Sequence, residues 1–268
     1  MSKTPTFDKS ALPPGLPVIV TGATGGIGAQ IARILASLGI PQIIAVRSEA
    51  KYNVLLVGLK KEYPDADISF LPLDLNSSHS VTEAVNRLAG RPLAGIINNA
   101  ATMQRDYSKS PDGPETTLNV NYFNTKLLNL LLLPDIQEGG AVVFTTSLTR
   151  LAGHRDHLPE TVTPRTFGQL KTYALSKKLI TRFAAEFAET ARPLGVRVNC
   201  CDPGVVDSGM ISMHRWFDPI ADVLFRPFIR TPQKGAIPAV RALLAPDSGK
   251  IYTLRKCLPL SHPAGANS

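Results

Sequence analysis

The sequence predicts an α/β protein in which helices cover both faces of one parallel sheet. Short apolar runs, the first of them Pro17-Val18-Ile19-Val20, alternate with stretches whose apolar side chains recur at helical spacing. Near-continuous apolar strands separated by helices are typical of a doubly wound parallel sheet. The 268 residues contain no internal repeat, low-complexity segment or linker, so we expect a single domain.

The elements of the first half follow from these patterns in order. Residues 1–15 read as an irregular leader, and the first apolar run is the first strand. The helix after it has Ile27, Ile31, Ile34, Leu35 and Leu38 on one face. The next elements are a strand at Ile43–Val46, a helix at Ala50–Tyr63 that ends before Pro64, a strand at Ile68–Leu73, a helix at Ser80–Leu88 and a strand at Ala94–Asn98.

The second half is predicted to contain longer helices. Prolines mark where two of them end, because a proline cannot continue a helix: Pro134 ends one, and Pro193 with Gly195 ends another. A further helix begins at Thr231-Pro232, with threonine as N-cap and proline at the first helical position. The predicted elements are a helix at Glu115–Leu133, a strand at Ala141–Thr146, a helix at Leu170–Arg192, a strand at Val196–Cys201 and a candidate last strand at Ile251–Leu254.

Three segments are too long to be simple connections: Ala101–Pro114, Leu148–Phe167 and Pro203–Arg230. Each follows the carboxyl end of a predicted strand, which is the edge where doubly wound sheets bind ligands. Long loops at that edge are usually functional. We therefore expect these segments to surround a binding site.

Composition and charge exclude several classes of function. The chain has 29 basic and 21 acidic side chains and a net charge of +8. The basic residues are scattered and no nucleic-acid motif is present, so we expect a solvated basic surface and no nucleic-acid partner. No stretch reaches the roughly 18 apolar residues of a membrane helix, and the N-terminus lacks the apolar core of a signal peptide. The sequence therefore predicts a cytoplasmic protein with no integral membrane segment.

The cysteines and histidines predict no metal site. Cys200, Cys201 and Cys257 lack metal-ligand spacing, and the first two lie beside an apolar strand, so we interpret the thiols as structural. His154 and His157 invite a metal interpretation, but no Cys or Glu accompanies them at helical spacing.

The most informative segment is Thr21-Gly22-Ala23-Thr24-Gly25-Gly26-Ile27-Gly28, between the first strand and the first helix. Gly22 permits a tight turn, while Gly26 and Gly28 let the backbone approach a pyrophosphate and let the helix pack close to the strand. The helix start offers unpaired N–H groups and a partial positive charge to phosphates. A strand, a glycine turn and a helix in this order predict a dinucleotide site, although a glycine turn by itself can be purely structural.

The spacing G-x3-G-x-G after a threonine resembles the TGxxxGxG fingerprint of the short-chain dehydrogenase/reductase family. The resemblance runs from about Val18 to Ala245 and rests on several ordered motifs. It implies a Rossmann-like NAD(P)-binding catalytic domain over residues 16–268, with a substrate loop at 203–230. The residues of the glycine turn that it assigns to cofactor binding are Thr21, Gly22, Thr24, Gly26, Ile27 and Gly28.

Arg47 predicts the type of cofactor. It follows the second strand, where an NAD site usually has Asp or Glu to bind the ribose hydroxyls. An arginine there can pair with a 2′-phosphate through its planar fork, so NADP(H) is the predicted cofactor. A surface arginine that merely ends a strand is the alternative.

Two further segments are assigned to the cofactor by the resemblance. Asp74 and Leu75 end the third strand near the expected adenine, although a helix-start or turn role is equally open for Asp74. Asn99 and Ala100 belong to a segment that matches the family's NNAG sequence except at Ala101. An alanine in place of glycine disfavours a positive φ and adds a Cβ beside the cofactor.

Tyr173-Ala174-Leu175-Ser176-Lys177 carries the predicted chemistry, because positions four residues apart share one helical face. A free tyrosine has a pKa of about 10, but a nearby ammonium and the positive ring of an oxidised nicotinamide favour the phenolate. Tyr173 can then exchange a proton with a substrate oxygen while the nicotinamide exchanges a hydride. By itself, the Tyr173–Lys177 pair also fits an ordinary exposed helix. The resemblance places both residues beside the cofactor as well.

The resemblance supplies two further catalytic residues. Ser147 stands where the family has the serine that hydrogen-bonds the substrate oxygen, with Thr145 and Thr146 as neighbours that a register slip could confuse with it. Asn121 resembles the asparagine that completes the family tetrad through a water relay to the lysine. Asn119 is its rival by position, and a plain structural role is open for either asparagine.

Two later features complete the resemblance. Asn199, Pro203-Gly204 and Ser208 match the family's NxxxPGxxxT with serine at the threonine position, which implies nicotinamide contacts from Pro203, Gly204, Val206 and Ser208. The 26 positions from Ser147 to Tyr173 exceed the gap in many members. This insertion resembles that of retinol-dehydrogenase-like and protochlorophyllide-reductase-like members.

Together the motifs imply an NADP(H)-dependent oxidoreductase that interconverts a carbonyl and an alcohol. Apolar side chains between Met210 and Ile229 suggest a lid over a lipophilic substrate, while lid packing or a dimer contact would explain them equally well. Reduction of a C=C bond is one alternative function, and a catalytically silent NADP(H)-binding sensor or scaffold is another. The resemblance also implies that the long helices beginning near Glu115 and Leu170 form the interface of a homodimer or homotetramer.

Overall fold

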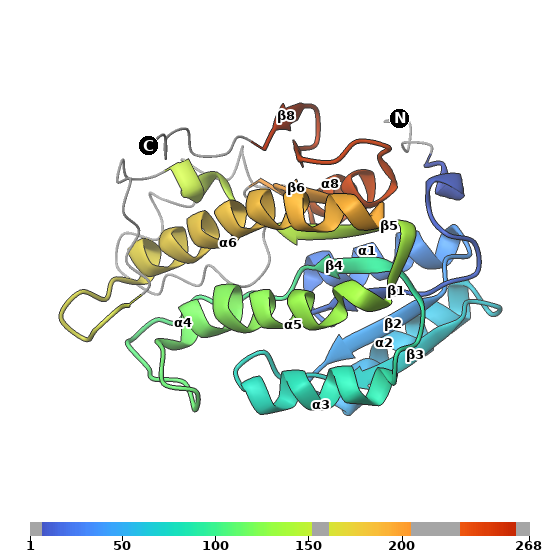
Figure 1. Cartoon of the computed structure of the whole chain (residues 1–268). Helices are drawn as coiled ribbons and strands as arrows, with labels where there is room; N and C mark the ends of the chain where they lie inside the picture. The colour runs from blue at the N-terminus through green and yellow to red at the C-terminus, as the bar shows by residue number, and fades with distance from the viewer. Residues whose placement is uncertain (1–6, 152–160, 205–230, 261–268) are drawn as a thin grey trace.

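The computed structural model describes residues 7–151, 161–204 and 231–260. In these residues, eight strands form one sheet in the order β3-β2-β1-β4-β5-β6-β7-β8 (Figure 1). Neighbouring strands are parallel except for β7 and β8. The strands are β1 (Val18–Thr21), β2 (Gln42–Val46), β3 (Ile68–Pro72), β4 (Leu93–Asn98), β5 (Ile136–Thr145), β6 (Arg197–Cys201), β7 (Lys250–Tyr252) and β8 (Cys257–Pro259). The predicted single α/β domain with a doubly wound sheet is confirmed.

Helices cover the sheet in two layers (Figure 1). One layer contains α1 (Gly26–Ser37), α2 (Glu49–Glu62) and α8 (Pro232–Leu244), and the other contains α3 (Ser78–Leu88), α5 (Asn124–Leu132) and α6 (Gln169–Ala191). Since alternate strand residues point to opposite faces, each layer closes a separate apolar core. On the α6 side, the Phe144 ring meets Phe183 and Phe187 edge-on, with centroids 5.7 and 6.1 Å away. Among the described helices, none is both long and apolar enough to cross a bilayer.

The helical stretch after the first long loop is not the single regular helix predicted over Glu115–Leu133. It consists of α4 (Thr116–Leu118), a π-helical turn (Asn119–Phe123), α5 and a 3₁₀ turn (Leu133–Asp135). Glu115 caps its start by accepting the backbone N–H of Leu118. π-helical turns are frequent at functional sites, and this one contains Asn121.

Two strand predictions are corrected by the structure. β5 begins at Ile136 rather than Ala141, and a shift in its register with β4 accommodates the added residues. β7 stops at Tyr252 because the chain turns back at Thr253, whose N–H donates to the Lys256 carbonyl. The returning segment forms β8, a strand that the sequence pattern did not predict.

The carboxyl ends of β1, β4, β5 and β6 lie at one edge of the sheet, at Thr21, Asn98, Thr145 and Cys201. The three long connecting segments begin at this edge. The strand order also reverses here, because β1 has β2 on one side and β4 on the other. Doubly wound sheets bind ligands at such a switch point.

Candidate active site

A cavity of about 550 Å³ opens at this edge of the sheet. Its walls come from the glycine turn, the segments that follow β2 to β6, and the start of α6. The predicted site residues that line it are Thr21, Gly22, Thr24, Gly26, Ile27, Gly28, Arg47, Asp74, Leu75, Asn99, Ala100, Ser147, Tyr173, Lys177, Pro203 and Gly204. The fold therefore brings the predicted cofactor residues and the Ser-Tyr-Lys residues to one place.

The glycine turn is held against the segment after β4. The Thr21 hydroxyl accepts the backbone N–H groups of Asn99 and Ala100 at 3.1 and 3.0 Å. The Asn99 side-chain amide donates to the Thr21 and Gly22 carbonyls, at 3.1 Å each. Gly22 has a φ of +66°, and a Cβ there would lie 2.8 Å from the Ala100 Cα. Glycine is required at this position by both the backbone conformation and the close contact.

The start of α1 faces the cavity and fits a dinucleotide. Gly25, the N-cap, has no side chain to cap the helix, so among the described residues the first N–H groups of α1 stay available to a phosphate. A Cβ on Gly28 would lie 2.3 Å from the Gly22 carbonyl oxygen, so only glycine lets α1 pack this close to the turn. These are the two features that the binding of a pyrophosphate needs from this turn.

Arg47 and Asp74 lie on the rim of the same cavity. Arg47 is exposed directly after β2, and no acidic side chain pairs with it among the described residues. Asp74 accepts the Asn76 N–H at 2.9 Å, so it has the turn role that the sequence left open while still lining the cavity. Its neighbour Leu75 is buried.

Asn98, the last residue of β4, does not line the cavity. The Asn98 side-chain amide pairs reciprocally with that of Asn129 in α5, through two hydrogen bonds of 2.9 Å. Ala101 stands where the family pattern has glycine. Ala89 is the only non-glycine residue with a positive φ in the described ranges, so Ala101 introduces no such strain.

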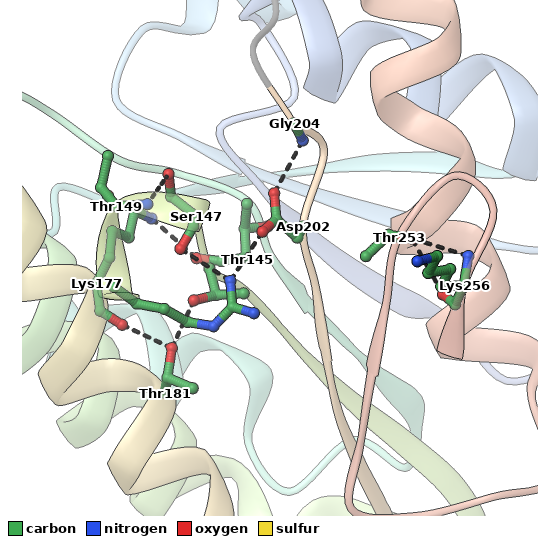
Figure 2. Close-up of polar contacts among 11 residues, drawn as sticks. Thr145, Ser147, Thr149, Lys177, Thr181, Asp202, Gly204, Thr253 and Lys256 are labelled. Atoms are coloured by element: carbon green, nitrogen blue, oxygen red, sulfur yellow. Dashed lines mark hydrogen bonds and ion pairs between the residues drawn. The ribbon is translucent and has the colours of Figure 1, made fainter. Parts of the chain in front are cut away.

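Ser147 lies just beyond the end of β5, as Figure 2 shows. Its Oγ accepts the Thr149 N–H at 3.3 Å, which leaves the hydroxyl proton available for another acceptor. The hydroxyls of Thr145 and Thr146 contact a β6 thiol and an α6 hydroxyl instead. These contacts distinguish Ser147 from the two neighbouring threonines.

Tyr173 and Lys177 lie one turn apart on α6. The Lys177 Nζ is 5.6 Å from the centroid of the Tyr173 ring and donates to the Thr145 carbonyl at 2.9 Å. Burial lowers the pKa of Lys177 to about 8, because a buried ammonium loses its hydration. The lysine is therefore still mostly protonated at pH 7.

Without the cofactor, the groups around Tyr173 favour the neutral phenol; the positive nicotinamide ring that the sequence prediction also invokes is not part of this balance. Burial raises the pKa of Tyr173 to about 12, and the negative charge of Asp202 contributes to the rise. A buried phenolate would lose its hydration, which is the main cause of the rise in the pKa of Tyr173. At neutral pH, Tyr173 is consequently a neutral phenol that can donate a proton.

The π-helical turn gives the two candidate asparagines different surroundings. Asn121 is buried, accepts the Thr102 N–H at 2.8 Å, and donates to the Thr102 carbonyl and the Ser176 hydroxyl at 2.8 and 3.0 Å. It therefore connects the first long loop to α6, next to the lysine, but it does not line the cavity. Asn119 instead donates to the Asp112 carboxylate at 3.0 Å, on the side of α3.

Sequence reasoning missed a buried ion pair beside the cavity. Arg150 Nη1 lies 2.8 Å from Asp202 Oδ2, and neither residue was singled out. The sequence feature that could have indicated Asp202 is its position directly after an apolar strand and before Pro203-Gly204. Cys200 and Cys201 are buried in β6, as expected for structural thiols, whereas Cys257 is exposed.

Several predicted residues lie outside the described residues: Val206, Ser208, His154, His157 and the apolar lid between Met210 and Ile229. Within the described part of the chain, no group of three or more His, Cys, Asp or Glu side chains is arranged to hold a metal ion.

Comparison with known proteins identifies relatives over most of the chain. The family model for short chain dehydrogenases matches residues 17–216. The chain is 34% identical to mouse polyprenol dehydrogenase over 254 residues, which cover 90% of this chain and 76% of that protein. It is 30% identical to human retinol dehydrogenase 12 over 248 residues, covering 90% of this chain and 78% of that protein.

Solved structures show the same fold. A putative uncharacterized protein from Mycobacterium paratuberculosis superposes with a TM-score of 0.74 at 24% identity, covering 96% of this chain and 90% of that one. A short chain dehydrogenase from Burkholderia cenocepacia, in complex with NADP, superposes with a TM-score of 0.70 at 22% identity and covers 92% of this chain and 97% of that one. The family resemblance predicted from the motifs is confirmed.

Proposed function

Because the chain belongs to the short-chain dehydrogenase family, we propose that it is an NADP(H)-dependent oxidoreductase that interconverts a carbonyl and an alcohol on a lipophilic substrate. The observation that carries the proposal is the presence of Ser147, Tyr173 and Lys177 on the wall of the cavity that contains the glycine turn. When bound, NADP(H) supplies the hydride donor or acceptor through its nicotinamide ring.

The residues assigned to the cofactor are those of the glycine turn, Arg47 and the segment after β4. The uncapped start of α1 suits the pyrophosphate. Arg47 is free to pair with a 2′-phosphate by bidentate hydrogen bonds, and no acidic side chain follows β2 before Glu49 to favour ribose hydroxyls. This combination favours NADP(H) over NAD(H).

The catalytic residues are assigned separate tasks. Ser147 donates a hydrogen bond to the substrate oxygen and keeps its proton, since its Oγ is already oriented by the Thr149 N–H. Tyr173 donates a proton to that oxygen in reduction and accepts one in oxidation. Lys177, held by the Thr145 carbonyl, stabilises the negative charge that forms on Tyr173 after the proton leaves. Asn121 lies outside the cavity and connects α6 to the Thr102 loop through its hydrogen bonds to the Ser176 hydroxyl and the Thr102 carbonyl.

The lipophilic substrate is inferred from the rim of the cavity. Leu148 and Leu170 both line the cavity and are 55% and 59% exposed, so they present apolar surface where a substrate would enter. The relatives named polyprenol and retinol dehydrogenase point in the same direction. In a series of alcohols of increasing chain length, kcat/KM should rise with length, and Leu170→Ser should flatten the rise. Equal kcat/KM values along the series would contradict a lipophilic substrate.

The cofactor assignment is tested by fluorescence titration with NADPH and NADH on the wild type, Arg47→Ala and Arg87→Ala. Arg87 is a matched control, because it is exposed on α3 and does not line the cavity. We expect Arg47→Ala to weaken NADPH binding by about tenfold or more and to leave NADH binding nearly unchanged. Preference for NADH would refute the cofactor assignment, and binding of neither would refute the oxidoreductase function.

The catalytic assignment is tested by Tyr173→Phe. We expect kcat to fall by about 10²–10⁴-fold while NADPH affinity stays within a few-fold of the wild type, because only the proton-transfer group is removed. An unchanged turnover rate would exclude Tyr173 as the acid. A biological activity that survives this substitution would support a non-enzymatic, cofactor-sensing role instead.

We also infer a homodimer or homotetramer that uses the α5 face. Leu130 and Leu131 are 44% and 38% exposed on this helix, beside the partly buried Phe123 and Leu127. Sedimentation should show an oligomer for the wild type and a monomer for Leu130→Glu/Leu131→Glu. Val54→Glu, on the exposed face of α2, should leave the mass unchanged. A monomeric wild type would refute this inference.

A further inference from the structure

The Arg150–Asp202 ion pair is unlike the other ion pairs in the described residues. Arg150 Nη1 and Asp202 Oδ2 are 2.8 Å apart, and the two side chains are only 9% and 2% exposed. The side chains of the other three pairs are at least 34% exposed. Such surface pairs contribute little, whereas breaking a buried pair is strongly unfavourable because one charge loses its partner.

The pair connects two segments of the cavity wall. Arg150 lies in the 3₁₀ turn that follows Ser147, and its Nη1 also donates to the Ser147 carbonyl at 3.0 Å. Asp202 follows β6, and its Oδ1 accepts the Gly204 N–H at 2.9 Å. Figure 2 shows Asp202 lying between Ser147 and Gly204, with a dashed line to Gly204. A continuous chain of hydrogen bonds thus runs from Ser147 to Gly204.

We propose that Arg150 and Asp202 are positioning residues that clamp the Ser147 segment to the Gly204 segment and so fix the spacing between the catalytic hydroxyl and the nicotinamide-binding turn. The proposal rests on the proposed function, because that function gives the two segments their roles. The strand pairing of β5 with β6 ends at Thr145 and Cys201, and one more backbone hydrogen bond follows, from the Thr146 N–H to the Cys201 carbonyl; the Ser147 and Gly204 segments lie beyond it. The Arg150–Asp202 pair therefore connects the two segments where the backbone pairing of β5 and β6 has ended, beside the catalytic residues.

The charge of Asp202 gives the clamp a second effect. The charged groups around Tyr173 in the described residues are Lys177 on the same helix, Asp202 after β6 and Arg150 opposite it. The β6 thiols are neutral at pH 7, because burial raises the pKa of both. Asp202 raises the pKa of Tyr173, so removing its charge should make the phenolate easier to form.

The test compares four variants with the wild type. Asp202→Asn keeps an oxygen for the Gly204 N–H and removes the charge, while Arg150→Met removes the clamp and Arg150→Lys retains its charge. Arg182→Met breaks an exposed pair on α6 and serves as control. Each is measured by NADPH titration, by kcat/KM for alcohol oxidation across pH, and by hydrogen exchange of residues 147–151 and 202–204.

We expect Arg150→Met to lower kcat by about tenfold or more through misplacement of Ser147, and Arg150→Lys to recover part of the loss. Asp202→Asn should move the pH at which oxidation sets in downward by roughly one unit, the size expected for one charge several ångströms away. Both Arg150→Met and Asp202→Asn should speed exchange of residues 147–151 by about tenfold. The control should match the wild type in every measurement.

Unchanged exchange of both segments in Arg150→Met and Asp202→Asn would overturn the proposal, as would a pH profile and kcat indistinguishable from those of Arg182→Met. If Arg150→Met does not fold, Arg150→Lys and the nearly isosteric Asp202→Asn decide the question. Hydrogen exchange needs neither cofactor nor substrate. A wild type without NADPH binding or turnover would therefore refute the proposed function, while the exchange rates would still decide whether the clamp exists.

Discussion

Replacing the buried Lys177 by methionine should remove activity and yet stabilise the fold at neutral pH. The side chain is 3% exposed, and its ammonium donates to the Thr145 carbonyl but forms no ion pair with a carboxylate of the described residues. A pKa lowered from 10.5 to about 8 means that the folded state disfavours the charged form. Methionine has a similar shape and no charge to bury.

The magnitude follows from proton linkage. The shift of the Lys177 pKa to about 8 corresponds to a destabilisation of about 3 kcal/mol at pH 7. Between pH 8 and 10.5 the unfolded chain binds the proton more tightly than the folded protein, so the wild type gains stability as pH rises through this window. Near pH 9.5 the destabilisation has fallen to about 1 kcal/mol. In Lys177→Met the hydrogen bond to the Thr145 carbonyl is lost, which reduces the gain in stability by about 1 kcal/mol at either pH.

Urea denaturation at pH 7 and near pH 9.5 measures the effect. We expect the free energy of unfolding of Lys177→Met to exceed that of the wild type by about 2 kcal/mol at pH 7. Near pH 9.5 the two free energies of unfolding should be nearly equal. Lys171→Met, exposed on the same helix, should differ little from the wild type at either pH. The reasoning would be refuted if Lys177→Met were less stable than the wild type at pH 7. It would also be refuted if the difference in free energy of unfolding between the two proteins were the same at both pH values.

Three further predictions concern packing around the site. Gly28→Ala should abolish NADPH binding and lower the denaturation midpoint, because its Cβ would meet a carbonyl oxygen at 2.3 Å, whereas Gly58→Ala, on α2 outside the cavity and with nothing within 4 Å of its Cβ, should do neither; equal titration curves for both would contradict this. Asn129→Leu should destabilise the fold by about 2 kcal/mol in urea denaturation, since it leaves the buried Asn98 Oδ1 without its donor while Nδ2 keeps only the Val143 carbonyl, and a wild-type midpoint would show that the pair contributes nothing. Arg197→Met should lower the free energy of unfolding by about 2–4 kcal/mol, because the guanidinium donates to carbonyls of the N-terminal segment, β5 and the end of α8. Limited proteolysis should then cut near residue 11 faster, and an unchanged cleavage rate would count against this role.

The central strands β1, β2 and β4 could be predicted because they are buried on both faces and read as apolar runs. The segment Ile43–Val46 and the observed β2 differ by one residue, Gln42, which is buried although it is polar and so does not belong to the apolar run. β8 could not be predicted in this way. Its residues Cys257–Pro259 are exposed, and they form a strand only because the turn at Thr253 returns them to β7.

The residues of the site were predictable where local spacing determines their placement. Tyr173 and Lys177 share a helix face, and the glycine turn follows a strand, so both could be recognised from neighbouring residues. Arg150 and Asp202 are separated by 52 positions and meet only because β5 pairs with β6. The π-helical turn around Asn121 depends in the same way on distant hydrogen bonds, to Thr102 and Ser176. Hydrophobic periodicity contains no information on such contacts.

The two perturbed pKa values at the site suggest how the direction of the reaction depends on pH. Burial keeps Tyr173 protonated up to a pKa of about 12 and leaves Lys177 with a pKa of about 8. Reduction of a carbonyl needs the protonated phenol, which the protein's own groups already favour at pH 7. Oxidation of an alcohol needs the phenolate, which forms only as pH rises or as positive charge is brought near the ring. We therefore expect kcat/KM for oxidation to rise steeply from pH 7 toward pH 9, while that for reduction stays level until Lys177 begins to lose its proton near pH 8. Parallel pH profiles in the two directions would mean that Tyr173 is not the group whose protonation limits the rate.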